Sequence, residues 1–362
     1  MNIAIVVKEF PPDVIGGAET QTKRMASELT DRGHDVIVFT KSYGNHDDSD
    51  VDYEVARVPN LRINSFLSDL TFVFFCLIAL LRRRTQFDVL QCMMVYPIGC
   101  LGYLANRLGG IPYFAWVRGN DFYKERHHPI KRRMMRAVFE DTQVLVQSPD
   151  VKRDVTEFFG EASAAFDLVV LGNGVSIPED QACPAESETV LFLGRLASKK
   201  GVECLLRAVS TIDTEIDLTI VGGGSERERL ETLAAELDID VTFIGEVHPD
   251  TVDRHYREAG IFVLPSEEGE GLPNAVLEAM SWGLPVVATD SGGLPTLISH
   301  LETGFIIEQT NQQMLKSRLK QLLDDPLLRE QMGNAGRERV RSKYGWDNFC
   351  TELEGVYNRI CG

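Results

Sequence analysis

The sequence predicts an α/β protein built from two Rossmann-like, doubly wound domains that face each other across a cleft. Its 362 residues are enough for two domains of roughly 100–200 residues each. Short apolar runs alternate with helical patterns along the chain, which is typical of βαβ units and a parallel sheet. The alternation breaks once, at residues 172–188, where turn formers, prolines and acidic residues have the composition of a linker.

The first domain, residues 1–171, is predicted to begin with a buried strand, a Gly-Gly turn and a helix at 18–32. Further strands are expected at 35–40, 88–93, 112–117 and 143–148. The longest apolar stretch, residues 71–81, has 11 residues. A helix needs about 20 to cross a bilayer. This stretch is therefore either a buried helix or one that lies in the plane of a membrane surface.

The second domain, residues 189–345, repeats the alternation, and helices follow to the end of the chain. Its strands are expected at 189–194, 217–222, 241–245, 260–265, 285–289 and 304–307, with helical periodicity over 311–362. Ligands of such sheets bind beyond the carboxyl ends of the strands. Functional side chains are therefore expected in the segments that follow strands.

Composition and charge exclude several classes of protein. Residues 1–148 have a net charge of +1 and residues 149–362 a net charge of −18. The acidic second half is therefore not expected to bind nucleic acid non-specifically. Seven irregularly spaced cysteines without a CxxC pair indicate reduced thiols and a cytoplasmic location. No spacing of Cys and His suggests a metal site. The N-terminal segment lacks the basic region of a signal peptide.

Two stretches of the second domain have the composition of a phosphate site. In "LGRLASKKG" (193–201), Arg195 and Lys199/Lys200 stand where a strand ends and a helix begins, which suits a pyrophosphate. A solvated basic turn is the equal alternative. The glycines of "VGGGSE" (221–226) let the backbone approach either a ligand or a neighbouring element.

The stretch "PSEEGEGLPNAVLEAMSWGLP" (265–285) places two carboxylates around the start of a helix. Pro273 is predicted in the first helical turn and the helix is expected to run to about Trp282. Glu270 then precedes the helix and Glu278 lies inside it. The pair suits a ligand with an anionic middle and hydroxyl-rich ends. The alternative is an ordinary capped surface helix, and surface positions are expected for the other two acids, Glu267 and Glu268.

Two segments of the first domain follow strands in the same way. Gly16-Gly17 opens a helix and suits an anion, or merely turns the chain. It is not the GxGxxG fingerprint of a dinucleotide site. In "WVRGNDFY" (116–123), Arg118 and Asp121 are candidates for substrate contact, against the alternative of a polar turn.

Together these blocks resemble the retaining glycosyltransferases of family 4, which have the GT-B fold. The resemblance covers nearly the whole chain and includes the Gly-Gly loop, "NGV" (173–175), "GRLASKKG" (194–201), "VGGG" (221–224), "FIGEV" (243–247), "SGGLP" (291–295) and "TGFII" (303–307). Its most specific block is residues 265–289, in which Glu270 and Glu278 form an E-x7-E pair.

The resemblance implies that a nucleotide-diphosphate sugar binds mainly to the second domain. Arg195 and Lys200 would bind the diphosphate, and Glu278 the ribose. Glu270 would lie beside the donor sugar and act at the reacting centre. The remaining donor-binding residues would be Gly16, Gly17, Gly271, Leu272 and Asn274. No metal or other cofactor is implied, and helix 346–362 is expected to pack on the first domain.

Two positions depart from the family pattern. Arg118 stands where many relatives have a histidine. An arginine cannot act as a general base. The predicted catalytic set therefore includes Arg118 as a cation, together with Asp121. Thr296 stands where relatives often have glutamate. Both departures bear on which sugar is accepted.

The predicted function is transfer of a sugar from a nucleotide-diphosphate donor to a glycan or lipid-linked acceptor. Residues 71–84 and 131–136, apolar and basic, are candidate contacts with an anionic membrane, with a core helix that has a charged end as the equal alternative. The competing functions are a sugar-nucleotide epimerase or hydrolase and a non-catalytic sugar-nucleotide binding protein.

Overall fold

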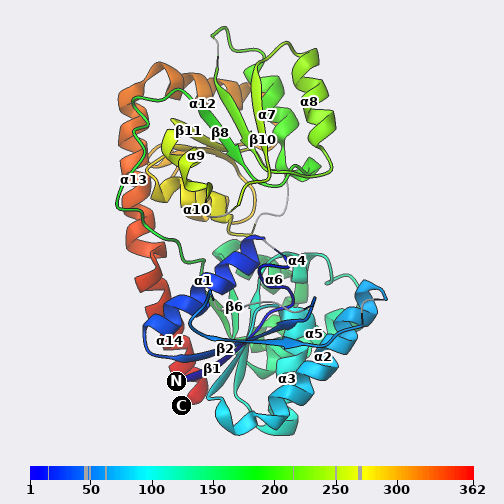
Figure 1. Cartoon of the computed structure of the whole chain (residues 1–362). Helices are drawn as coiled ribbons and strands as arrows, with labels where there is room; N and C mark the ends of the chain where they lie inside the picture. Colours follow the sequence, from blue (N-terminus) through cyan, green and yellow to red (C-terminus); the bar gives the residue numbers. More distant parts are fainter. Residues whose placement is uncertain are drawn as a thin grey trace. The chain divides into compact units, whose positions relative to one another are not determined.

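The protein divides into two compact units. The computed structural model describes residues 1–14, 16–44, 48, 50–61, 63–214, 216–248, 251–267 and 271–362, with the backbone alone at 65, 66 and 120. Unit 1 comprises Met1–Gly174 together with Trp346–Gly362, and unit 2 comprises Val175–Gly345. Each unit is a parallel sheet covered by helices (Figure 1).

The sheet of unit 1 has seven strands in the order β3-β2-β1-β4-β5-β6-β7, and all neighbours are parallel. The strands are β1 (Asn2–Val6), β2 (Asp35–Lys41), β3 (Glu54–Val58), β4 (Val89–Cys92), β5 (Tyr113–Val117), β6 (Val144–Val146) and β7 (Leu168–Val170). The strand order reverses at β1, which lies between β2 and β4. The loops after β1 and β4 therefore flank the crevice in which doubly wound sheets bind ligands.

Helices cover both faces of this sheet. They are α1 (Gly17–Asp31), α2 (Ser65–Arg82), α3 (Cys100–Gly109), α4 (Asn120–Tyr123), α5 (Pro129–Asp141), α6 (Pro149–Phe159) and α14 (Trp346–Cys361). The core under one face includes side chains of α2, α3, α5 and α6, and that under the other includes side chains of α1 and α14.

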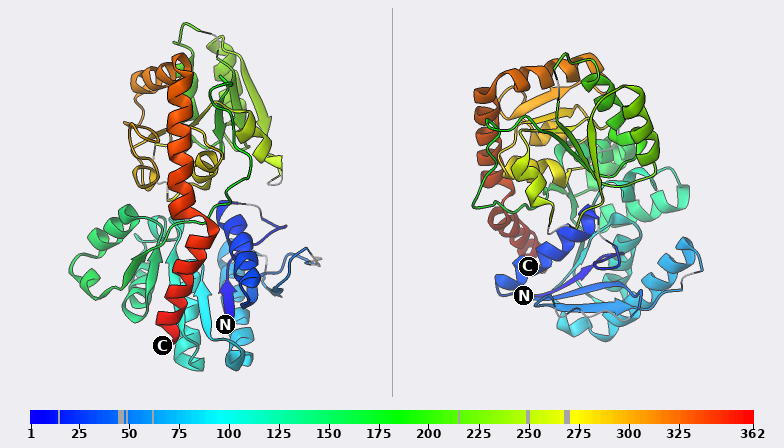
Figure 2. Two further views of the ribbon diagram at one scale, coloured as in Figure 1. Left: turned by 90° about the vertical axis from the view of Figure 1, so that its left-hand side faces the viewer. Right: turned by 45° about the horizontal axis from the view of Figure 1, so that its top comes forward.

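The last helix, α14, is an integral part of unit 1. Phe349 stacks on Trp116 of β5 with ring centroids 6.0 Å apart, and the Tyr357 hydroxyl donates a 2.6 Å hydrogen bond to Gln91 Oε1 of β4. The Cys361 thiol lies 3.5 Å from the carbonyl oxygen of Asp88, whose carboxylate accepts from the Asn2 amide. Both chain ends thus lie at the same edge of unit 1 (Figure 2).

Unit 2 has a six-stranded parallel sheet in the order β10-β9-β8-β11-β12-β13. Its strands are β8 (Val190–Leu193), β9 (Leu218–Val221), β10 (Val241–Gly245), β11 (Ile261–Leu264), β12 (Val286–Thr289) and β13 (Gly304–Ile307). Its helices are α7 (Val202–Val209), α8 (Arg227–Glu236), α9 (Asp253–Glu258), α10 (Asn274–Ser281), α11 (Leu294–Leu297), α12 (Gln312–Asp324) and α13 (Pro326–Tyr344). The strand order reverses between β8 and β11.

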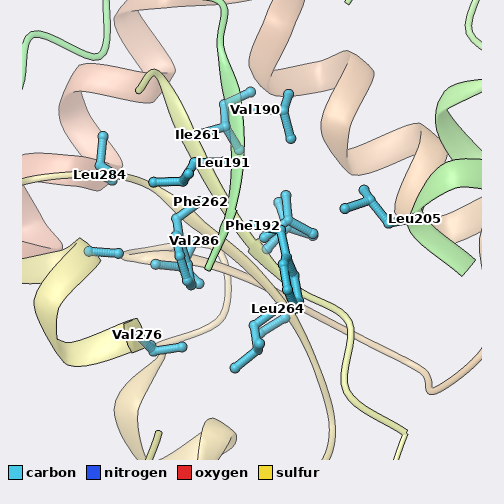
Figure 3. Packing of buried hydrophobic residues seen from close by; sticks show 14 of the residues in the cluster. Val190, Leu191, Phe192, Leu205, Ile261, Phe262, Leu264, Val276, Leu284 and Val286 are labelled. Atoms are coloured by element: carbon cyan, nitrogen blue, oxygen red, sulfur yellow. The ribbon is translucent and has the colours of Figure 1, made fainter. Parts of the chain in front are cut away.

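The centre of unit 2 is a continuous apolar core. Val190, Leu191 and Phe192 of β8 pack beside Ile261 and Phe262 of β11, and all five side chains are at most 1% exposed (Figure 3). Strands buried on both faces read as unbroken apolar runs, which is why these segments show no polar alternation in the sequence. This packing holds the carboxyl ends of β8 and β11 side by side.

The predicted α/β architecture with two parallel sheets is confirmed, with small differences at element ends. The strands at 241–245 and 304–307 have their predicted bounds, and most others lose a residue at one or both ends. The prediction had no strand at Glu54–Val58 or Leu168–Val170. Both are outer strands of the sheet with partly exposed residues, so neither has the unbroken apolar run of a central strand. Helix α13 ends before Gly345, which separates it from α14.

The apolar stretch 71–81 lies within α2, one face of which is buried. Phe72, Cys76 and Leu80, spaced four residues apart, are fully buried, whereas Leu70 and Phe74 are more than half exposed. Among the described residues, we find no helix with both the length and the apolar character that crossing a bilayer requires.

Candidate functional site

Two predicted site loops of unit 2 lie together where its strand order reverses. The first connects β8 to α7 through the short helical turn Ser198–Lys200, and the second follows β11. The backbone N–H of Glu267 donates a 2.8 Å hydrogen bond to the carbonyl oxygen of Lys199. A Cβ on Gly201, whose φ is +67°, would lie only 1.9 Å from the carbonyl oxygen of Pro265. Glycine is therefore needed for the two loops to touch.

The arginine of the first loop is available to a ligand. The Arg195 side chain is exposed and has no hydrogen bond or ion pair within the described part of the chain. Lys200 is half-buried in the same loop, and its backbone N–H donates to the carbonyl oxygen of Ala197. A free guanidinium at the carboxyl edge of a strand offers a two-donor fork to a phosphate.

The glycines after β9 serve close packing of neighbouring loops. A Cβ on Gly222 or Gly224 would lie 2.0 Å from the Gly194 carbonyl oxygen and 2.2 Å from that of Leu196, respectively. The Leu196 amide donates a 2.7 Å hydrogen bond to the carbonyl oxygen of Gly223. Of the two interpretations of this glycine run, the structure shows approach to a neighbouring element. The run thereby fixes the backbone on both sides of Arg195.

Helix α10 begins one residue later than the sequence predicts. Pro273 has an extended ψ of 119° and is the N-cap, so Asn274 is the first helical residue. A proline fits both at the N-cap and in the first helical turn, because neither position needs its missing N–H. The helix ends at Ser281, with Trp282 as its C-cap. Glu270, the predicted group at the reacting centre, lies outside the described residues, as does Glu268.

The start of α10 is tied to the loop after β12. The Gly293 amide donates a 3.0 Å hydrogen bond to the carbonyl oxygen of Gly271, and Leu272 is buried below it. A Cβ on Gly293 would lie 2.2 Å from the same oxygen. Gly271, Leu272 and Asn274 are therefore held at the carboxyl edge of the sheet, in the region of the predicted donor site.

Glu278 is positioned by a residue that the sequence analysis missed. The hydroxyl of Tyr256 in α9 donates a 2.8 Å hydrogen bond to Glu278 Oε2. Burial raises the pKa of Glu278, while the Tyr256 hydrogen bond acts in the opposite direction. Tyr256 is fully buried and lies 22 residues before Glu278 in the chain. No motif connects the two residues, so only the fold could identify this pair.

In unit 1, Arg118 lies in a polar cluster at the carboxyl edge of the sheet. It follows β5 directly, and Gln147 follows β6. The Arg118 guanidinium, through Nη1, and the Gln147 side-chain amide, through Nε2, both donate to Asn173 Oδ1, with N–O distances of 3.1 and 3.0 Å. The Arg118 guanidinium also lies over the Trp116 ring, 4.9 Å from its centroid. Gln147 was not predicted from the sequence, because a glutamine after a short strand has no motif around it.

The Arg118 side chain is a desolvated cation with spare donor capacity. Its Nε is buried and has no hydrogen-bond partner among the described residues. Burial lowers the pKa of Arg118 to about 10, partly offset by Asp121 and Glu19. The guanidinium is therefore still charged at neutral pH. A buried donor left unpaired costs free energy that a bound oxygen acceptor would recover.

Asp121 holds the loop rather than facing solvent. Its two carboxylate oxygens accept backbone hydrogen bonds from Val95, at 2.8 Å, and Arg118, at 2.9 Å. Burial raises the pKa of Asp121 to about 6 despite these bonds. With both oxygens occupied, the carboxylate joins the segments after β4 and β5. These contacts give it a positioning role, and its assignment as a catalytic group stays a prediction.

The Gly-Gly loop begins helix α1 as predicted. Gly16 is the N-cap and Gly17 the first helical residue. Glu19, in the first turn, points back toward the cap, because a Cβ on Gly16 would lie 2.5 Å from Glu19 Oε2. A carboxylate already lies beside this helix terminus, so an anionic ligand would have to share the space. The described residues contain no group of three or more His, Cys, Asp or Glu that could hold a metal ion.

Comparison with known families matches both halves of the chain. Residues 15–177 match the family described as Glycosyltransferase Family 4, and residues 176–339 match Glycosyl transferases group 1. A similar relative is the GDP-mannose-dependent alpha-(1-6)-phosphatidylinositol monomannoside mannosyltransferase of Mycobacterium tuberculosis. It is 26% identical over 379 residues, which cover 97% of each chain.

Solved structures show the same fold over the whole chain. Sucrose-phosphate synthase from Thermosynechococcus elongatus superposes with a TM-score of 0.84 at 21% identity, covering 99% of this chain and 98% of that one. Anabaena HepE, solved in complex with UDP-glucose, superposes with a TM-score of 0.81 at 17% identity, covering 99% and 100%.

Proposed function

We propose, from the premise that this chain belongs to the family 4 type of glycosyltransferases with the GT-B fold, that it transfers a sugar from a nucleotide-diphosphate donor with retention of anomeric configuration. The acceptor in this proposal is a glycan or a lipid-linked sugar. The relative from Mycobacterium tuberculosis is named for a GDP-mannose donor and a phosphatidylinositol mannoside acceptor. Anabaena HepE was solved with UDP-glucose.

One observation carries the proposal. The exposed, unpaired Arg195 and the start of α10, with Glu278 held by Tyr256, lie at the point where the strand order of unit 2 reverses. A nucleotide-diphosphate sugar requires a cation for its diphosphate and a carboxylate that is already oriented to accept from its hydroxyl groups. In this proposal Arg195 and Lys200 bind the diphosphate and Glu278 accepts from the ribose hydroxyls.

The reaction itself needs no redox partner. The bond between the sugar C1 and the diphosphate oxygen breaks, and the acceptor oxygen bonds to C1 on the same face. The acceptor proton passes to the leaving phosphate oxygen. Negative charge grows on the diphosphate as the bond breaks, and fixed cations at Arg195 and Lys200 would stabilise it without a metal. Glu270 is proposed to lie beside the donor sugar.

Unit 1 is proposed to supply acceptor binding and a further cation. Arg118, charged and with its Nε unpaired, is proposed to bind an anionic or carbonyl oxygen of a substrate. Asp121 is proposed to keep it in place, since the carboxylate accepts from the Arg118 backbone. Gly16 and Gly17 are proposed to let the α1 terminus approach the substrates. We further propose a cytoplasmic enzyme that meets its acceptor at a membrane surface.

A thermal-shift screen against UDP- and GDP-sugars tests donor binding, because a ligand of the folded state raises the unfolding temperature by mass action. A donor should stabilise the wild type and stabilise Arg195→Ala or Glu278→Gln much less. Absence of a shift with every donor would contradict the proposal.

Turnover separates transfer from the competing functions. Incubation of the best donor with and without a membrane extract should release nucleotide only when an acceptor is present, and NMR of the product should show the donor's anomeric configuration. Release without acceptor would indicate a hydrolase or epimerase. Tight binding without any turnover would indicate a non-catalytic binding protein.

A further inference from the structure

The outer surface of the α2–α3–α5 layer of unit 1 gathers most of the exposed apolar side chains. Nine of the thirteen exposed large hydrophobic side chains in the described part of the chain lie on these helices or in the segment that leads into α2. They are Leu61, Ile63, Leu70, Phe74, Phe75, Leu104, Leu108, Ile130 and Met134. The three helices lie side by side on one face of the sheet (Figure 1). We call this surface the α2–α3–α5 face.

The face is apolar because of how α2 packs. A helix that is apolar all round is normally buried all round. In α2, only the side that carries Phe72, Cys76 and Leu80 reaches the core, and Leu70 and Phe74 are left 54% and 57% exposed. A concentration of exposed apolar side chains on one layer of helices favours a surface that contacts something less polar than water.

The same face is basic, although the protein is strongly acidic. Residues 65–84, 100–109 and 129–141 together hold eight Lys or Arg and three Asp or Glu, a net charge of +5, against −17 for the whole chain. Arg132 and Arg133 of α5 are exposed and have no side-chain hydrogen bond or ion pair within the described residues. Of the three arginines at the end of α2, Arg83 is held by Glu54, with N–O distances of 2.5 and 3.0 Å.

A groove of about 640 Å³ opens beside the arginines of α5. Arg132, Arg133 and Arg136 line one side, and Phe158 and Phe159, at the end of α6, line the other. Its one acidic lining residue, Glu140, is paired with Arg136 at 2.7 Å. The groove is therefore lined by two unpaired guanidinium groups and by aromatic rings, which suits a phosphodiester with an attached hydrocarbon chain.

We propose that the α2–α3–α5 face docks on an anionic phospholipid surface, with a headgroup phosphate bound in the groove between α5 and α6. The exposed side chains of α2 and α5 enter the boundary between headgroups and acyl chains, and Arg132 and Arg133 neutralise phosphates. A nucleic acid would leave the apolar residues uncovered. The docking itself is independent of the proposed function. It deepens that function by stating where the enzyme meets a lipid-linked acceptor, and this part rests on the proposal above.

Cosedimentation of the full chain with vesicles tests the docking. The chain should bind vesicles of phosphatidylcholine and phosphatidylglycerol in equal parts and not vesicles of phosphatidylcholine alone, and salt should weaken the binding. Arg132→Ser/Arg133→Ser should lower the partition coefficient about 30-fold, since each basic side chain near an anionic surface contributes to binding independently. Leu70→Ser/Phe74→Ser should lower it about tenfold or more.

Matched variants on unit 2 control for charge and for hydrophobicity. Lys320→Ser/Arg341→Ser removes two basic side chains that are 47% and 63% exposed, and Ile244→Ser/Leu327→Ser removes two exposed apolar ones. Both should bind vesicles as the wild type does. Equal binding to the two vesicle types, or equal losses in face and control variants, would overturn the proposal.

Two further measurements complete the test. Sedimentation without vesicles should show the same mass for wild type and face variants. Dimers that the face variants abolish would overturn the proposal in favour of a second copy of the chain. The thermal shift with donor should be the same in all four variants. If docking fails while the donor shift is intact, the proposed sugar transfer stands and its place at a membrane surface is contradicted. If the wild type shows no donor shift, the proposed sugar transfer alone is contradicted.

Discussion

Replacing Tyr256 by phenylalanine tests whether the Glu278 carboxylate is oriented by Tyr256 to bind a ligand or is merely a buried acid. The change removes one oxygen and leaves the ring, which is fully buried, in place. It deletes the 2.8 Å hydrogen bond to Glu278 Oε2. No other partner of this carboxylate is known from the described side chains, so the substitution leaves it desolvated and free to change rotamer.

The size of the effect follows from that contact. A hydrogen bond to a charged group contributes about 1.5–3 kcal/mol. Unit 2 should therefore lose up to about 3 kcal/mol of stability. If Glu278 holds the ribose, a misplaced carboxylate should also raise the nucleotide Kd about tenfold, since 1.4 kcal/mol corresponds to one factor of ten. Because the Tyr256 hydroxyl lowers the pKa of Glu278, its loss should raise that pKa further.

Calorimetric titration with the preferred nucleotide diphosphate, repeated across pH, measures the Kd and its pH dependence, and denaturant unfolding measures the loss of stability. The acid limb of binding should move to higher pH in Tyr256→Phe, a change that a purely structural hydroxyl would not cause. Tyr113→Phe is the matched control, because the Tyr113 hydroxyl of unit 1 donates a 3.0 Å hydrogen bond to the Asp141 carboxylate. It should lose stability and keep the nucleotide Kd.

A double-mutant cycle with Glu278→Gln decides the case. If Tyr256 acts through Glu278, the effects of the two changes on Kd should be strongly non-additive. Additive effects, or a Kd in Tyr256→Phe equal to that of the Tyr113→Phe control, would refute the reasoning.

Three further predictions concern other contacts. Arg195→Ala should leave the unfolding temperature unchanged, since its side chain has no partner within the described residues, and should weaken nucleotide-diphosphate binding about tenfold or more in calorimetry, as expected for a charge-assisted pair. A loss of stability would show that it is structural instead. Gly201→Ala should destabilise unit 2 by about 2 kcal/mol or more in denaturant unfolding, because its Cβ would lie 1.9 Å from the Pro265 carbonyl oxygen. Gly33→Ala is the control, because Gly33 has a φ of +86° but nothing lies within 4 Å of the added Cβ. It should lower the free energy of unfolding only by the conformational part, about 1 kcal/mol. Equal losses in the two variants would contradict the role of the contact between Gly201 and Pro265. Burial raises the pKa of Asp121 from 3.8 to about 6, so the folded chain binds this proton more tightly than the unfolded chain. Its contribution to stability is therefore complete below pH 3.8 and is lost as pH rises through 6. Between pH 3.8 and 6 the free energy of unfolding of the wild type should fall by about 3 kcal/mol relative to that of Asp121→Asn, as measured by denaturant unfolding at a series of pH values. Parallel plots of this free energy against pH for the two proteins would exclude the raised pKa.

The central strands were predictable because they are buried on both faces. Burial of Val190, Leu191 and Phe192 demands an unbroken apolar run, and such a run is visible in the letters alone. The outer strands β3 and β7 were not predictable in this way, because solvent relaxes the demand on their side chains. The end of α13 depended on one glycine, Gly345, within an otherwise helical periodicity.

The candidate site divides in the same manner. Residues of the post-strand loops, such as Arg195 and the glycines at 222–224, are marked in the sequence because turns and close approaches restrict residue type. Tyr256 and Gln147 are not marked, because a hydrogen bond between elements needs only the correct distance in space. For Asp121, the sequence suggested a reacting group, and the structure shows a carboxylate bound by the backbone at both oxygens.

The sequence alone determined the two α/β sheets, the loops that follow their strands and the family to which the chain belongs, because periodicity and turn chemistry are local properties of the chain. Only the tertiary structure decided which loops meet, as at Gly201 and Pro265, which carboxylate is preset, as in Glu278, and which side of α2 is exposed. Those outcomes depend on the packing of residues far apart in the chain. A helix that is apolar on all sides does not reveal from its letters which side the core will cover.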